Sequence, residues 1–347
     1  MKKNYDIVDL FKWICAWLVV CIHIPPFQSD VALLNVFIVQ GIARIAVPFF
    51  FSTSMFFLFK KLKRDEDKKI NRKSILRFAI RIFSLYIGWA LIYYAYRAFY
   101  RVYNGINYPY TPFGIILDFF ARGVHYHLWY LIATVIALPA VCLLWRCGRV
   151  PLIVTCVFLH ILQCLDLPYH FAPIFDHPVI AFYTEEYDIL SRTILHAIPL
   201  MCLGVICQMD ASKRSGKEWG KLLLIALVVF FAELIILLVI KGKELKMERS
   251  LTSVFLVYCL TNWLFTMEFQ FTKAWIGKAL RISSVWIYCI HPLVRELYHW
   301  VFAYDGIIRF VVVCAVTFVS SVMYTALKLW WEKRCALRKQ RKLQVPS

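Results

Sequence analysis

Apolar runs as long as a membrane span recur along the whole sequence. The run at residues 222–240 is typical, because Glu233 is its only charged residue. About 20 such residues in a helix cross the hydrocarbon core of a bilayer. With 61% hydrophobic and 18% charged residues among 347, the chain has far more apolar surface than one globular core needs. The sequence therefore predicts an all-α fold, a polytopic membrane helix bundle.

The basic residues mark one side of this predicted bundle. The formal net charge is +19, but the Lys and Arg residues lie in short segments between the apolar runs. Residues 60–73 hold eight basic and three acidic residues, whereas residues 150–191 contain no Lys or Arg. By the positive-inside rule the first segment is cytosolic and the second is external. Residues 241–249, with four cations in a loop predicted to be external, break this rule. The pattern indicates a lipid bilayer, and no nucleic acid, as partner.

We predict about ten transmembrane helices, with both termini in the cytosol. The predicted spans are residues 7–24, a run that ends at 59, 75–100, 127–145, a run that begins at 150, 189–208, 222–240, 251–267, 282–302 and 307–330. Residues 1–331 form the predicted membrane domain, and residues 332–347 form a basic cytosolic tail that we expect to lie on anionic lipid. A short apolar piece at 113–120 is expected to lie along the membrane surface.

The first predicted span carries one cation near its start, Lys12, and one imidazole near its end, His23. On a helix these residues lie about 20° from the same face and roughly 16 Å apart along the axis. Two ionisable groups on one face of a span indicate a functional site. In the alternative reading Lys12 snorkels to the inner surface, where it pairs with Asp9, and His23 lies at the outer interface.

Further cations and imidazoles occur inside or beside other spans. Arg44 lies within the second apolar run, and Arg77 and Arg81, four residues apart, share a helix face at the start of the third. Ordinary positive-inside flanking also explains the latter two. His127 and Trp129 open the fourth span from the outer side, where an interfacial aromatic belt also explains the tryptophan.

His291 precedes Pro292 in the ninth span. We expect the proline to interrupt the helix there, so that the freed carbonyl groups face a cavity or a neighbouring helix. His291 then either lines a site or contributes to packing.

Several motifs resemble the membrane acyltransferase family 3, bacterial O-acetyltransferases that modify surface glycans. The first is the cation, ten residues and histidine of the first span. The others follow in order as 44–51 (RIAVPFFF), 127–131 (HLWYL), 199–204 (PLMCLG) and 287–293 (IYCIHPL). The chain is also similar to the membrane half of vancomycin-resistance serine racemases. It has Lys12 where the family usually has Arg, and Ser54-Met55 where the family commonly has Ser-Gly.

The resemblance implies transfer of an acetyl or similar short acyl group from acyl-CoA to a hydroxyl of a cell-envelope glycan or related acceptor. His23 would serve as general base or transient acyl carrier, because an imidazole titrates near neutrality. Coenzyme A is a cytosolic polyanion, so its phosphates need cations on the inner side. The implied roles are catalysis for His23 and Lys12, donor binding for Arg44, Lys73, Arg77 and Arg81, and acceptor contact or site lining for His127, Trp129 and His291.

The resemblance also implies a location in the bacterial plasma membrane, with acyl-CoA as cosubstrate and no bound cofactor. We expect no metal, because His125, His127, His170 and His177 lack a matching ligand pattern. Two other classes remain open. One is a transporter whose helices break at prolines around a central site; the other is a non-catalytic membrane protein of the same fold. The prolines in question are Pro48, Pro139, Pro199 and Pro292.

Overall fold

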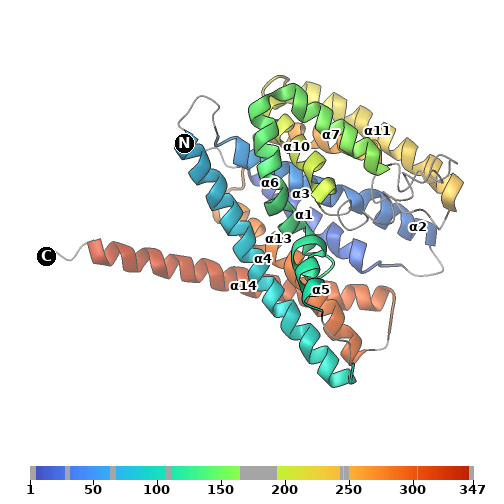
Figure 1. Ribbon diagram of the computed structural model, residues 1–347, viewed down its shortest axis with the longest axis vertical. Coiled ribbons are helices and arrows are strands. Elements are labelled where there is room, and N and C mark those ends of the chain that lie inside the picture. The colour runs from blue at the N-terminus through green and yellow to red at the C-terminus, as the bar shows by residue number, and fades with distance from the viewer. Residues whose placement is uncertain are drawn as a thin grey trace. The chain divides into compact units, whose positions relative to one another are not determined.

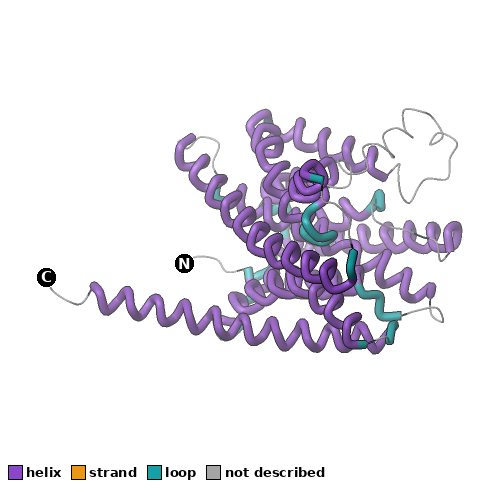
Figure 2. The backbone as a smooth tube through the Cα atoms, turned by 60° about the horizontal axis from the view of Figure 1, so that its bottom comes forward, coloured by secondary structure: helices purple, strands orange, loops and turns teal. Residues whose placement is uncertain are grey.

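The described part of the protein consists of helices and their connections. The computed structural model describes residues 5–27, 32–62, 68–106, 111–164, 194–242, 245, 250–302 and 304–343. Within these ranges Figure 2 shows helix and loop and no strand, which confirms the all-α prediction. The acidic segment after residue 164 that is predicted to be external, the middle of residues 60–73 and most of 243–249 lie outside the described residues.

The chain forms two compact units. Unit 1 combines Met1–Asn35 with Glu268–Ser347, and unit 2 is Val36–Met267. The predicted membrane domain at 1–331 runs through both units. α14 (Ile307–Leu343) continues through residue 332, where the predicted tail begins, and the division into a membrane domain and a cytosolic tail stays a prediction.

In unit 1, α13 (Trp275–Val301) packs against both α1 (Asp6–His23) and α14. The contact with α1 follows from the spacing of buried residues on α1, which form one face at Val8, Cys15, Ala16, Val19 and Val20. The contact with α14 includes Trp286, whose ring stacks on that of Tyr324 at 3.9 Å between centroids. In Figure 1, α13 and α14 are the orange and red helices near the C-terminal end of the colour scale.

Pro292 does not interrupt α13, so the expectation from the sequence was wrong. A proline removes the N–H that would bond to the carbonyl four residues earlier, here that of Tyr288. The imidazole of His291 hydrogen-bonds to the backbone of Ile287 and Tyr288, and its Nδ1 lies 3.0 Å from the Ile287 carbonyl oxygen. A side chain that bonds to the freed backbone is one way a membrane helix tolerates proline.

Pro48 lies in the first turn of α3 (Ala46–Phe59), directly after a π-helical turn and a 3-10 turn. The other two prolines of the predicted spans lie further inside helices. Pro139 is within α6 (Trp129–Cys147), and Pro199 is within α10 (Ile194–Asp210). The helix breaks that motivated the transporter alternative are therefore absent at both positions.

Unit 2 is arranged around α10, which packs against α3, α6, α7 and α12. Its other elements, labelled in part in Figure 1, are a π-helical turn (Phe37–Gly41), a 3-10 turn (Ile42–Ile45), α3 (Ala46–Phe59), α4 (Lys68–Asn104), α5 (Pro112–Leu117) with a π-helical turn (Asp118–Arg122), α7 (Arg149–Cys164), α11 (Gly216–Lys241) and α12 (Ser253–Thr266). Before them in the sequence, the short helix α2 (Ala32–Val36) spans the boundary between the two units, with all but its last residue in unit 1. Almost every residue of α10 from Ala197 to Cys207 is buried, which explains why its sequence is apolar on all sides.

Gly204 brings α10 close to α3. A Cβ at this glycine would lie 2.2 Å from the carbonyl oxygen of Ser52 and 2.8 Å from the Cβ of Met55. Met55 is fully buried and stands where the resembled family commonly has glycine. The small residue at this helix contact is therefore on α10.

Length and apolar composition identify this as a multi-pass membrane protein. Among the described residues, five helical segments are long and apolar enough to cross a membrane: Leu33–Phe59, Ile70–Asn104, Trp129–Cys147, Gly216–Lys241 and Ile307–Arg338. Helices α7, α10 and α12 are apolar but shorter. Helices α1 and α13 occupy two further predicted spans and carry more ionisable residues. A helix thus lies at each predicted position, and five of them meet both criteria for a span.

Candidate functional site

His23 and His291 lie together in unit 1. His23 is the last residue of α1, His291 is completely buried in α13, and their rings stack with centroids 5.5 Å apart and planes 18° apart. A carbonyl oxygen only accepts hydrogen bonds, so the bond to Ile287 places the proton of a neutral His291 on Nδ1. The α1–α13 packing therefore holds a ring of fixed orientation against the predicted catalytic imidazole.

The acids in the first turns of α1 bind to α13 and to the segment just before it. The Asp9 carboxylate, almost fully buried, forms an ion pair with Arg281 at 3.1 Å. Asp6 accepts a hydrogen bond from the backbone N–H of Phe271 at 2.9 Å. Lys12 is half-buried one turn after Asp9. The sequence reading considered Lys12 as the partner of Asp9 and overlooked Arg281, which lies 272 positions away and has no local signal.

Arg44 in unit 2 lies in the only irregular part of its helical run. The run passes from a π-helical turn to a 3-10 turn before α3 begins, and Arg44 is in the 3-10 turn. Its Nε and Nη2 both donate to Oε1 of Gln40, at 3.1 and 2.9 Å. Departures from α-helical geometry frequently occur at functional sites. Arg44 is thus a half-buried guanidinium held by a neighbouring amide.

Lys73, Arg77 and Arg81 form an exposed row along α4. Leu76 and Ile80, on the same side of the helix, are each 54% exposed. The Arg81 guanidinium lies 5.7 Å from the centroid of the Phe78 ring. The shared face predicted for Arg77 and Arg81 is present, and it also carries large apolar residues, as a lipid-facing surface would.

His127 and Trp129 are brought to one end of α6. His127 is buried in the turn before the helix, where its Nδ1 lies 3.2 Å from Nδ1 of His125. Trp129 is the first residue of α6, and its ring packs against Phe51 and His196, with centroids 5.9 and 5.7 Å away. Lys12, His23 and His291 belong to unit 1, and the remaining predicted site residues belong to unit 2.

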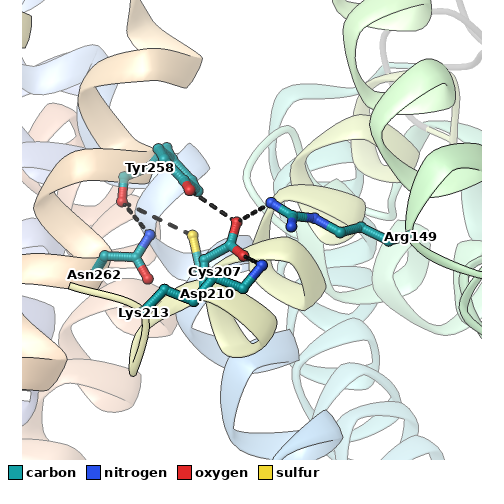
Figure 3. Close-up of polar contacts among 6 residues, drawn as sticks. All are labelled: Arg149, Cys207, Asp210, Lys213, Tyr258 and Asn262. Carbon is teal, nitrogen blue, oxygen red and sulfur yellow. Dashed lines mark hydrogen bonds and ion pairs between the residues drawn. The ribbon is translucent and has the colours of Figure 1, made fainter.

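A buried ion-pair network in unit 2 was missed by the sequence reading (Figure 3). Asp210, the last residue of α10, is 2% exposed and has three partners. These are Arg149 at 2.8 Å, Lys213 at 2.7 Å and the hydroxyl of Tyr258 at 2.8 Å. The Asp210 carboxylate accepts hydrogen bonds from Arg149 and Tyr258 and forms an ion pair with Lys213. The sequence signal for this network was a single acid at the end of an apolar helix, followed closely by basic residues.

The described residues contain no group of three His, Cys, Asp or Glu side chains placed to hold a metal. His170 and His177 lie outside the described residues. All twelve cysteines are free thiols, and most are buried, as the sequence predicts for small core residues.

Several helices that can cross a bilayer, together with ionisable side chains buried between them, define a multi-pass membrane protein with a polar site. Residues 5–326 match the family model described as an acyltransferase domain, that of acyltransferase family 3. The chain belongs to this family, and the resemblance found in its motifs is confirmed. No solved structure matches the chain significantly.

The relatives that match the chain are named as racemases and not as acyltransferases. An amino-acid racemase of Enterococcus faecalis is 25% identical over 342 residues, which are 94% of this chain and 47% of the relative. A serine/alanine racemase of Enterococcus gallinarum is 25% identical over 301 residues, 82% of this chain and 40% of the relative. A further match to an Enterococcus faecalis racemase is 34% identical over 142 residues, 39% of this chain and 18% of the relative. The chain spans about half the length, or less, of these relatives.

Proposed function

We propose that this membrane acyltransferase moves an acetyl or similar short acyl group from cytosolic acyl-CoA to a hydroxyl of a cell-envelope glycan or related acceptor. It would work in the bacterial plasma membrane, with about ten spans and both termini in the cytosol. Support comes from the acyltransferase family model, which matches residues 5–326. The sequence motifs described above, which resemble those of the O-acetyltransferases, also support the proposal.

The observation that carries the mechanism is the contact of His23 with His291. In the proposed reaction His23 accepts the proton of the acceptor hydroxyl while the oxygen attacks the thioester carbonyl. The new C–O bond forms, the C–S bond breaks, and the proton passes to the departing thiolate of coenzyme A. His291 is the positioning residue, since its own ring is fixed by the backbone of α13.

The remaining predicted residues have supporting roles in this proposal. Lys12 would stabilise negative charge near the reacting thioester, as a compact cation without the fork of arginine. Arg44, Lys73, Arg77 and Arg81 would bind the phosphates of the donor. His127 and Trp129 would contact the acceptor, which suits a site that combines a buried imidazole with a partly exposed aromatic ring.

A second candidate rests on the names of the relatives. Because these are racemases of amino acids such as serine and alanine, a small amino acid is an alternative substrate, either as the hydroxyl acceptor or as the cargo of a transporter. Uptake of labelled serine into vesicles that contain the protein, compared with acetylation of serine by labelled acetyl-CoA, distinguishes these two alternatives.

The main test is transfer of label from acetyl-CoA in membranes, normalised to inserted protein. His23→Ala should lower the rate by roughly 100- to 10,000-fold, the contribution of a positioned general base. His299→Ala is the matched control, because His299 lies on α13 in the same unit but is exposed. Normal transfer by His23→Ala would remove the proposed mechanism.

A further inference from the structure

Three cations of unit 2 are held in place, two by Asp210 and one by a tryptophan that packs beside the Asp210 network. Arg149, at the start of α7, and Lys213, just after α10, both bind the buried carboxylate of Asp210, and Figure 3 shows them reaching it from different directions. The guanidinium of Arg214 lies 5.9 Å from the ring centroid of Trp219, which is 1% exposed. The Trp219 ring in turn packs edge-on against the ring of Tyr258, with centroids 5.4 Å apart, and the Tyr258 hydroxyl donates a hydrogen bond to Asp210.

These cations retain donors that Asp210 does not use. An arginine has five N–H donors and a lysine has three. The side chains of Arg149 and Lys213 are 45% and 49% exposed, although the carboxylate between them is 2% exposed. The buried Asp210 carboxylate therefore holds both cations in position, while the N–H groups that do not contact it stay accessible to solvent. A cation held in this way loses little side-chain entropy when an anion binds, which favours affinity.

The charge around this network is strongly positive. Arg146, in the last turn of α6, and Lys217, in the first turn of α11, are also exposed. Glu218 is the exposed acid nearest to Asp210 in the sequence. Its carboxylate accepts hydrogen bonds from the backbone N–H and the hydroxyl of Ser215, at 2.8 and 2.9 Å, and so caps α11 rather than pairing with these cations. The cations face outward with one buried counter-ion between them, an arrangement that suits a ligand with more than one negative charge.

We propose that Arg149, Lys213 and Arg214 form a phosphate-binding site at the end of α10. Its ligand is a phosphate ester, carried either by coenzyme A or by an anionic lipid headgroup. If the ligand is coenzyme A, the site rests on the proposed function. It then adds a contact to the acyl donor that lies outside the residues identified by the motifs. The charge pattern of the adjoining turns, with Arg146, Arg149, Lys213 and Lys217, assigns the site to the cytosolic side, where both ligands occur.

The first arm of the test measures coenzyme A binding to the purified full chain in phosphatidylcholine nanodiscs. Lys213→Gln and Arg214→Gln should each raise the Kd about ten-fold, the effect of losing one charge-assisted hydrogen bond. Lys217→Gln is the matched control: it removes the same charge from an exposed lysine in the first turn of α11, outside the three residues of the proposed site, and should leave the Kd unchanged.

Asp210→Asn tests whether the cations must be held in place. If the site is built on Asp210, this variant should bind coenzyme A more weakly, although it removes a negative charge. A diffuse positive surface predicts the opposite, because its potential would rise. If Asp210→Asn does not accumulate as folded protein, the Lys213 and Arg214 variants decide, since both change exposed side chains.

The second arm repeats the comparison in nanodiscs that contain phosphatidylglycerol, with the retained lipid counted by native mass spectrometry. Loss of retained phosphatidylglycerol in Lys213→Gln and Arg214→Gln, with an unchanged coenzyme A Kd, would assign the site to lipid headgroups. Unchanged binding of both ligands, or an equal loss in Lys217→Gln, would overturn the proposal.

Acetyl transfer measured in parallel separates this inference from the proposed function. Wild-type protein that binds coenzyme A through these cations but transfers no acetyl group would refute the function and leave the site intact. Normal transfer, with ligand binding that no variant changes, would refute the site and leave the function intact.

Discussion

The close contact between α10 and α3 predicts that Gly204→Ala destabilises the protein. The new Cβ would lie 2.2 Å from the Ser52 carbonyl oxygen, whereas ordinary contact begins at 3.4 Å, so the two helices must separate by about 1.2 Å (3.4 − 2.2). The obstructing atoms include the backbone of α3, which cannot rotate away as a side-chain end can. Overpacking of this kind costs about 1–3 kcal/mol of unfolding free energy.

Gly88→Ala is the matched control for this prediction. Gly88 is also inside a helix, α4, but a Cβ there would meet nothing within 4 Å. Both substitutions gain the roughly 0.5–1 kcal/mol by which alanine is better than glycine in a helix. Gly88→Ala should therefore stabilise the protein slightly, and the difference between the two variants isolates the cost of the contact, about 1–3 kcal/mol.

The assay is reversible unfolding of the purified protein in mixed micelles, with helix content followed by circular dichroism as the denaturing detergent increases. Gly204→Ala should unfold at a lower detergent fraction than wild type, and Gly88→Ala at the same or a higher one. If the two variants were equally stable, the close approach of α10 to Ser52 would be wrong.

Four other predictions follow from the site and the helix ends. His291→Phe keeps a ring against His23 and should retain more acetyl transfer than His291→Ala; equal losses would argue against positioning by ring contact. Lys12→Arg should keep much of the transfer activity and Lys12→Ala should lose most of it, unless the charge has no role. Glu233→Ala should lower the unfolding free energy by about 1–3 kcal/mol, and Glu233→Gln by less, because this carboxylate accepts from two backbone N–H groups at the start of α12, at 2.9 and 3.0 Å. A reporter inserted beside Lys217 should be cytosolic and one beside Tyr103 external; finding both on one side would refute the ten-span topology.

The sequence determined the class of fold because long apolar runs in a membrane can satisfy their backbone only as helices or closed barrels. The helix positions followed from the same runs, and α1 at Asp6–His23 differs by one residue at each end from the predicted span at 7–24. The family was also readable, because its motifs are local in sequence. For the candidate site, local spacing placed His23 at the end of a helix and put Arg77 and Arg81 on one face.

The tertiary structure decided which distant groups meet. The stacking of His23 on His291 and the pairing of Asp9 with Arg281 join α1 to α13 across most of the chain, where no sequence periodicity connects them. The continuity of α13 at Pro292 was not predicted from the sequence either; in the folded helix the His291 side chain bonds to the Ile287 carbonyl one turn before the proline. The Asp210 network was unpredictable for the same reason. A buried charge is stable only with partners, and here they come from α7, from α12 and from the turn that follows α10, which meet only once the chain has folded.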